Sequence, residues 1–170
     1  RAIRLVLERG TGEHGLLKMG AGDWNDGMDQ VGNRGQGESV WLTWFGITVL
    51  DGFGPIARHQ GDGEMASLCE EWGEHLRQAA RDAWDGDWYL RGWYDDGSPL
   101  GSAQCQECQI DSIAQSWAVL AGERDGRAKQ ALRSALNRLF DREAGIVKLF
   151  DPPFADGPAK QGYIKGYLPG

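Results

Sequence analysis

Apolar residues recur every three or four positions over four stretches, and this spacing predicts four helices in the chain. The first covers 38–50, where aromatic side chains face a core, and the Gly-Pro step at Pro55 then ends or bends it. The second covers 62–84 and is the most amphipathic, with one apolar stripe and mostly charged side chains opposite. Two shorter helices are expected over 110–120 and 126–140.

The remaining stretches carry loop and strand signals. Residues 1–9 look like the last turns of a helix that Gly10 ends, and residues 11–38 form a long glycine-rich loop without a period. Loops of that length inside a compact domain are usually functional. Residues 87–102 place alternating aromatic residues before an Asp-Asp-Gly turn, which predicts a short strand and a hairpin. Residues 146–154 are expected to be extended because paired prolines exclude a helix.

Together these elements predict a mainly α fold with long functional loops and a short β-hairpin. Their order indicates an array of antiparallel helix pairs whose loops gather at one end. A length of 170 residues fits one domain or part of one. We expect a fragment of a longer protein, because the chain starts without Met and ends on a turn signal over 167–170.

Composition narrows the function classes. The net charge of −7 and the low pI argue against a nucleic-acid-binding surface and favour a neutral substrate. Twenty-six glycines and eight tryptophans favour a loop-rich protein with aromatic-lined clefts, although a lectin surface would show the same bias. The pair Cys105 and Cys108 has no second pair or histidine cluster near it in sequence, so neither a metal site nor a cofactor is expected. Cys69 is expected in the core, and the apolar stretch 40–50 is too short to span a membrane.

The densest chemistry lies in residues 22–28, which read Gly-Asp-Trp-Asn-Asp-Gly-Met. Carboxylates can transfer protons or bind hydroxyls, a Trp ring can lie under the apolar face of a sugar, and a carboxamide offers a donor and an acceptor. This combination indicates a carbohydrate site. The alternative is that the Asp and Gly residues only form and cap turns. The residues by themselves do not decide whether Asp23 or Asp26 is the reacting acid.

Three residues outside this loop are further candidates. Arg91 is the single cation in an aromatic patch, where it either binds sugar hydroxyls or forms an ion pair with Asp95 or Asp96. Asp111 and Gln115 are four residues apart and share one helical face. They either point together into a cleft, or Asp111 caps the N-terminus of its helix.

The loop motif resembles the signature loop of the family-94 glycoside phosphorylases. That family comprises the cellobiose, cellodextrin and chitobiose phosphorylases and the phosphorylase-like C-terminal region of cyclic β-1,2-glucan synthases. Further family-like blocks extend the resemblance over nearly the whole chain, and the last-named branch is indicated by the string Ile-Asp-Ser-Ile-Ala-Gln-Ser-Trp. These blocks are residues 31–42, 88–101, 110–117 and 163–167. Since the family's catalytic fold is an (α/α)6 barrel, the resemblance implies that residues 1–170 are a fragment of a single barrel domain, with too few helices to close it.

The resemblance implies inverting phosphorolysis of a β-glucosidic bond, in which inorganic phosphate attacks the sugar and glucose 1-phosphate is released. Such a reaction needs one general acid and no base, and the motif match places that acid on Asp26. A general acid near neutral pH needs a raised pKa, for which burial against Trp24 and repulsion from Asp23 are the expected causes. The residues expected to bind the substrate are Asp23, Trp24, Asn25, Arg91, Asp111 and Gln115.

Two rival functions stay open. A glycoside hydrolase on the same barrel would use water and would need a carboxylate base, for which Glu38 and Asp111 are candidates. A non-catalytic glucan-binding or regulatory domain of a cyclic glucan synthase would not depend on Asp26. The resemblance places the family's phosphate-binding histidine block after Gly170.

The expected partners are a β-glucan oligosaccharide, inorganic phosphate as co-substrate, and the rest of a larger polypeptide. Nucleic acid is not expected, and a homodimer stays open. A free phosphorylase would be cytoplasmic, whereas part of a cyclic glucan synthase would be associated with the inner membrane.

Overall fold

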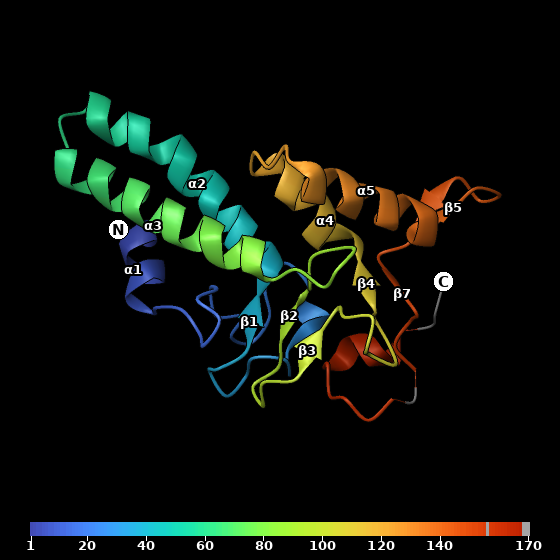
Figure 1. The fold of residues 1–170 in the computed structure, drawn as a ribbon. Coiled ribbons are helices and arrows are strands. Elements are labelled where there is room, and N and C mark those ends of the chain that lie inside the picture. Colours follow the sequence, from blue (N-terminus) through green and yellow to red (C-terminus); the bar gives the residue numbers. More distant parts are fainter. Residues whose placement is uncertain (156, 168–170) are drawn as a thin grey trace.

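The computed structural model describes residues 1–155 and 157–167 and is mostly helical with few short strands (Figure 1). Its described α-helices are α1 (Ala2–Glu8), α2 (Val40–His59), α3 (Gly63–Asp82), α4 (Ser112–Leu120) and α5 (Gly126–Leu139). Each helix that the apolar spacing predicted is present, so the prediction of a mainly α fold is confirmed. The turn predicted over 167–170 lies outside the described residues, apart from residue 167.

Helix α2 begins where the hydroxyl of Ser39 accepts a hydrogen bond from the Leu42 N–H at 3.0 Å. The prediction that the helix ends or bends at the Gly-Pro step is wrong, since α2 continues through Pro55 to His59. Gly54 packs against Cys69 of α3, whereas Pro55 is exposed to solvent. Packing along α3 therefore offsets the one backbone hydrogen bond that the proline removes, and water can reach the carbonyl that is left free.

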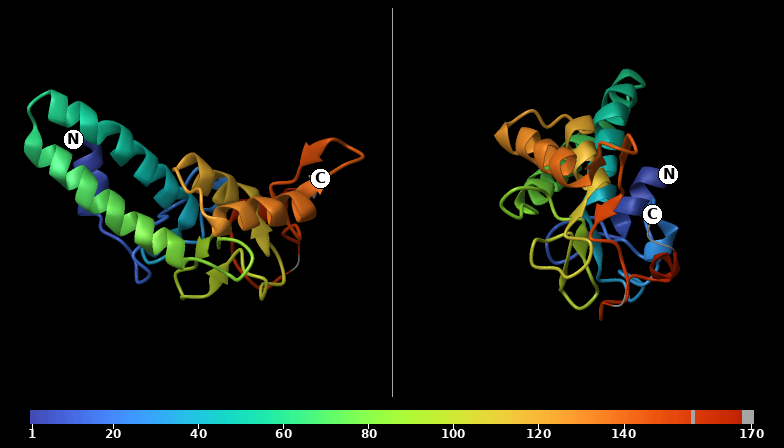
Figure 2. Two further views of the ribbon diagram at one scale, coloured as in Figure 1. Left: turned by 45° about the horizontal axis from the view of Figure 1, so that its top comes forward. Right: turned by 90° about the vertical axis from the view of Figure 1, so that its right-hand side faces the viewer.

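The helix α2 is also long and apolar enough, by length and composition alone, to cross a membrane. Core helices pass the same test, and α2 packs side by side with α3 in every view (Figures 1 and 2). Helix α3 starts at Asp62, whose carboxylate accepts from the Met65 N–H at 3.0 Å. Cys69 is buried between the two helices, as expected.

Helices α4 and α5 form a second, shorter pair beside α2 (Figure 1). Asp111 caps α4 by accepting a hydrogen bond from the Ile113 N–H at 2.8 Å. Asp125 caps α5 in the same way, through the Ala128 N–H at 2.8 Å. The antiparallel helix pairs of the sequence prediction are thus present, and most of the strands and the long loops lie on one side of them, below the helices in Figure 1.

A small antiparallel sheet connects the long loop to the helices. Its strands are β1 (Glu38–Ser39), β2 (Gly92–Trp93) and β3 (Pro99–Leu100), in that order. The predicted hairpin is confirmed as β2 and β3, with Gly92 opposite Leu100. The pairing of β1 with β2 was not predicted, because nothing in residues 38–39 carries a strand signal.

Two further two-stranded pairs complete the fold. Strand β4 (Ile110–Asp111) pairs with β7 (Phe150–Asp151), and β5 (Phe140–Asp141) pairs with β6 (Ile146–Val147). A second apolar cluster lies under the loops, separate from the helical core, and contains Met28, Leu100 and Ile164. This cluster ties the motif loop to the hairpin and to the last described segment.

Candidate functional site

The motif loop folds into a short 3-10 helix, η1 (Asp26–Met28), which is held by successive side-chain caps. The carboxylate of Asp23 accepts from the Asn25 N–H at 3.0 Å, and the Asn25 side chain accepts from the Gly27 N–H at 3.1 Å. Met28 is fully buried, whereas Asp26 is exposed. The loop therefore presents Asp26 outward from a backbone that its neighbours fix.

Asp23 forms a buried ion pair with Arg91. The Arg91 guanidinium reaches both carboxylate oxygens of Asp23 at 2.7 Å, and neither side chain has exposed surface. The Ser39 hydroxyl donates to Asp23 at 2.5 Å and accepts from Arg91 at 3.0 Å. Although burial raises the pKa of Asp23, the charge and hydrogen bonds of Arg91 outweigh it and hold that pKa below its usual value.

Asp111 is the second carboxylate beside Arg91, and it is bound less well. Its Oδ2 lies 3.3 Å from the Arg91 Nε, but neither atom has a hydrogen bond of acceptable geometry within the described part of the chain. Its other oxygen caps α4. Burial therefore raises the pKa of Asp111 to about 6, against the opposing charge of Arg91.

Gln115 completes the buried layer beneath the loop. Its amide accepts from the Tyr89 N–H at 2.8 Å and donates to the Tyr89 carbonyl at 2.8 Å and the Asp111 carbonyl at 2.9 Å. Gln115, Arg91 and Asp111 are all nearly or wholly buried. The expected cleft-facing pair of Asp111 and Gln115 is not seen, and the alternative of an Asp111 cap is confirmed.

The expected ion pairs of Arg91 with Asp95 or Asp96 are wrong. Asp95 instead accepts backbone N–H groups of the motif loop, including that of Gln36 at 2.8 Å. Asp96 accepts from the Ser98 hydroxyl at 2.5 Å within the hairpin turn. Asp95 is thus used by the preceding loop and Asp96 by the hairpin turn, and Arg91 pairs with Asp23 instead.

A cavity of 330 Å³ lies beside Asp26. Its aromatic walls come from Trp24, Tyr163 and Tyr167, whose exposed fractions are 57%, 53% and 62%. Tyr163 begins η2 (Tyr163–Gly166) and Tyr167 follows it directly. This segment is about 140 residues from Trp24 and Asp26 in the sequence. The full lining is Trp24, Asn25, Asp26, Gly27, Leu149, Tyr163, Ile164 and Tyr167.

Tyr163 and Tyr167 are site residues that the sequence pattern did not indicate. Their segment is held against the motif loop by the Tyr163 N–H, which donates to Asp29 at 3.1 Å. Gly27 and Ile164 are in close contact, since a Cβ on Gly27 would lie 2.7 Å from the Ile164 Cβ. The two tyrosines around Lys165 were a signal in the sequence. Their contact with residues 22–28 could not be predicted, because the two segments are far apart along the chain.

An exposed acid between exposed aromatic rings suits a hydroxyl-rich ligand, and comparison with known proteins agrees. Residues 1–170 match the model of the glycosyl hydrolase 94 superfamily, catalytic domain. The chain belongs to this family. The resemblance inferred from the motifs is thereby confirmed.

Relatives of this glycosyl hydrolase 94 chain include both synthases and phosphorylases. It is 49% identical over 172 residues to the cyclic beta-(1,2)-glucan synthase NdvB of Rhizobium meliloti (strain 1021), which covers all of this chain but 6% of that protein. It is 37% identical to the 3-O-beta-D-glucopyranosyl-beta-D-glucuronide phosphorylase and 36% identical to the solabiose phosphorylase of Paenibacillus borealis. Each of these two matches covers 94% of this chain and 21% of the relative.

The two carboxylates considered as a hydrolase base are already engaged in this family-94 chain. Glu38 is buried and accepts from the Leu16 N–H at 3.0 Å and the His14 Nδ1 at 2.6 Å. Asp111 is buried against Arg91. Neither residue lines the cavity beside Asp26.

The expected surroundings of the general acid are not in place. Asp26 is exposed rather than buried against Trp24, and the charge of Asp23 is compensated by Arg91. Among residues 1–155 and 157–167, no group of three His, Cys, Asp or Glu side chains could hold a metal ion.

Proposed function

We propose that this chain is part of the (α/α)6-barrel catalytic domain of an inverting β-glucan phosphorylase, with Asp26 as its general acid. The observation that carries the proposal is the position of Asp26, exposed in a cavity whose walls are Trp24, Tyr163 and Tyr167. Phosphorylases among the relatives support the reaction type. The activity belongs to the complete protein, because this chain spans a small part of its relatives.

In the proposed reaction, Asp26 donates its proton to the glycosidic oxygen as the bond to the anomeric carbon breaks. Inorganic phosphate attacks that carbon from the opposite face, which inverts its configuration and gives glucose 1-phosphate and a shortened glucan. The attacking phosphate already carries charge, so no base is required. Burial of Asp26 then comes from the bound sugar itself.

Of the remaining residues, some line the cavity and can contact the sugar, and others are buried and hold the loop in place. Trp24 and the two tyrosines offer ring faces for sugars, and Asn25 offers a carboxamide at the cavity wall. Arg91, Asp111 and Gln115 are buried, so their contribution to substrate binding is exerted through Asp23 and the loop. The β-1,2 linkage of the substrate is proposed because one relative is a cyclic beta-(1,2)-glucan synthase.

A second candidate function is a non-catalytic glucan-binding domain within a cyclic glucan synthase. The exposure of Asp26 favours it, because a binding site needs no buried acid. A hydrolase is less well supported, since Glu38 and Asp111 are committed to the fold. The binding function and the phosphorylase function differ in their dependence on Asp26.

The test uses the complete reading frame that encodes this chain. Glucose 1-phosphate is measured from a β-1,2-glucooligosaccharide and inorganic phosphate with the wild type, Asp26→Asn and the control Asp87→Asn, an exposed acid outside the cavity. We expect Asp26→Asn to lower kcat by about 100- to 10,000-fold and the control to match the wild type.

Two other outcomes would contradict the proposal. Free glucose formed without phosphate would support a hydrolase. Glucan binding without either product, unchanged in Asp26→Asn, would support the binding domain.

A further inference from the structure

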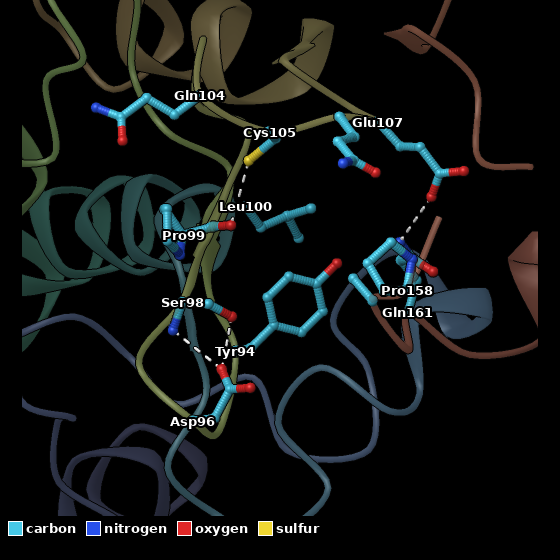
Figure 3. A pocket seen from close by; sticks show the side chains of 12 residues that line it. Tyr94, Asp96, Ser98, Pro99, Leu100, Gln104, Cys105, Glu107, Pro158 and Gln161 are labelled. Carbon is cyan, nitrogen blue, oxygen red and sulfur yellow. Dashed lines mark hydrogen bonds between the residues drawn. The ribbon is translucent and has the colours of Figure 1, made fainter. Parts of the chain in front are cut away.

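A second hollow of the molecule does not contain Asp26. A cavity of 470 Å³ lies between the β2–β3 turn, residues 104–107 and residues 158–161 (Figure 3). A neighbouring cavity of 410 Å³ shares Tyr94, Asp96 and residues 158–159 with it. Each volume is in the range of about 300–1,000 Å³ in which proteins bind small ligands. We call the two together the hairpin groove.

The first cavity of the hairpin groove is lined by carboxamides, by apolar side chains and by two carboxylates, those of Asp96 and Glu107. Carboxamides come from Gln104, Gln106 and Gln161, and the ring of Tyr94 forms part of the wall (Figure 3). Among the described residues that line this cavity, none is Lys, Arg or His. A neutral, hydroxyl-rich ligand therefore fits this first cavity better than an anion does. The second cavity also holds Lys160 and Arg34, and the Arg34 Nε lies 3.8 Å from Asp95.

Gln161 is the strongest sign that a ligand belongs there. Its side chain is 1% exposed, and its Oε1 accepts no hydrogen bond from residues 1–155 or 157–167. A buried acceptor without a donor is costly, and a ligand hydroxyl at this wall would supply one. The Gln161 Nε2 is held 3.4 Å from Glu107, so the amide is oriented in advance.

The acids at the groove are also fixed before any ligand binds. Glu107 accepts from the Ala155 N–H at 2.7 Å and the Gly157 N–H at 2.8 Å. Asp96 accepts from the Ser98 hydroxyl and its N–H. Since these carboxylates are already satisfied, the groove does not require a cation to balance them.

The hairpin groove and the Asp26 cavity share one segment of chain. Gln161 lines the groove, and its carbonyl accepts from the Gln30 N–H at 3.2 Å. Two residues later, Tyr163 lines the Asp26 cavity and donates its N–H to Asp29. A ligand in the groove thus contacts the segment that forms a wall of the cleft.

We infer that the hairpin groove is an accessory site for a neutral glucan chain, which retains long substrates near the cleft. The inference rests on the proposed glucan substrate but not on the reaction at Asp26. Two adjoining cavities suit an oligosaccharide of several sugar units, whereas a disaccharide engages the cleft alone.

The test is calorimetric titration of the complete Asp26→Asn protein with a long β-1,2-glucan and with a β-1,2-linked disaccharide, in phosphate-free buffer. The groove variant is Gln104→Ala/Gln106→Ala, whose side chains are exposed, and the control is Gln60→Ala at the far end of α2. We expect the groove variant to weaken long-glucan binding about 30-fold, about 2 kcal/mol at 1.4 kcal/mol per factor of ten. Disaccharide binding should not change in the Asp26→Asn background. Disaccharide phosphorolysis, measured separately with phosphate in the same groove variant with Asp26 intact, should not change either.

Gln161→Met is the second variant, because it removes the unpartnered acceptor while keeping the side-chain volume. We expect weaker long-glucan binding together with an unchanged or higher Tm. Equal long-glucan affinity with and without the groove substitutions would overturn the inferred accessory site. Normal disaccharide turnover in the same experiment would still support the proposed function. If long-glucan binding depends on the groove residues but the protein with Asp26 intact forms no glucose 1-phosphate, the groove is supported and the proposed function is contradicted.

Discussion

Arg91 and Asp23 are 68 residues apart in sequence and form an ion pair without exposed surface. The backbone of Arg91 is itself fixed, because its N–H donates to the Leu100 carbonyl at 2.8 Å and its carbonyl accepts from the Val40 N–H at 3.1 Å. The pair therefore connects the motif loop to the hairpin and to the start of α2. The position of Asp26 depends on this connection.

Arg91→Met should loosen the motif loop. Removing one partner of a buried ion pair leaves an uncompensated charge, which typically costs about 3–5 kcal/mol. We expect a lower Tm and a kcat lowered about 100-fold, because a displacement of about 1 Å at a reacting group has an effect of that size. Thermal unfolding and glucose 1-phosphate formation measure the two effects.

The matched control is the double variant Arg91→Met/Asp23→Asn. It removes both charges, and an asparagine at position 23 can still accept from the Asn25 N–H. We expect most of the lost stability to return at about pH 5, where the buried carboxyl of Asp111, the other acid beside Arg91, holds a proton. A double variant as unstable as Arg91→Met would show that packing, rather than the unpaired charge, is responsible.

Asp111 should make stability depend on pH. Its pKa is raised from 3.8 to about 6, so between these values the folded protein holds a proton that the unfolded chain has released. Stability therefore falls as pH rises from about 4 to about 6 and then levels off, by at most about 3 kcal/mol. The difference in Tm between wild type and Asp111→Asn, measured across this range, isolates the effect. A difference that grows in favour of the wild type with rising pH would contradict it.

Gly27→Ala should separate the motif loop from η2. The added Cβ would lie 2.7 Å from the Ile164 Cβ, and such overpacking typically costs about 1–3 kcal/mol. We expect a lower Tm and weaker glucan binding. Gly52→Ala is the control, since it lies in α2 with no atom within 4 Å of the new Cβ and should be neutral or stabilising.

Trp24→Ala should weaken glucan binding by removing the largest exposed ring at the cavity. A loss of about 1.4 kcal/mol corresponds to a tenfold higher KM, roughly the scale of one aromatic contact. Trp24→Phe keeps a ring face and should retain most of the affinity. Steady-state kinetics with a β-1,2-glucooligosaccharide would show the difference, and an unchanged KM in Trp24→Ala would exclude Trp24 from the sugar site.

The sequence by itself determined the helices, the hairpin and the family. Local periodicity fixes which face of a helix is apolar. The motif over residues 22–28 is specific enough to indicate the family from the sequence alone. The C-terminal end of α2 could not be predicted, because proline usually ends or kinks a helix. Pro55 is tolerated within α2 because packing against α3 supports the helix there.

The tertiary structure decided the partners of the polar side chains. Arg91 could be assigned to Asp95 or Asp96 by proximity in sequence, yet its buried partners are Asp23 and Asp111. The aromatic wall from η2 likewise meets the motif loop only in the fold. Propensity and periodicity act over a few residues, whereas ion pairing and cavity formation depend on which distant segments share the same low-dielectric space.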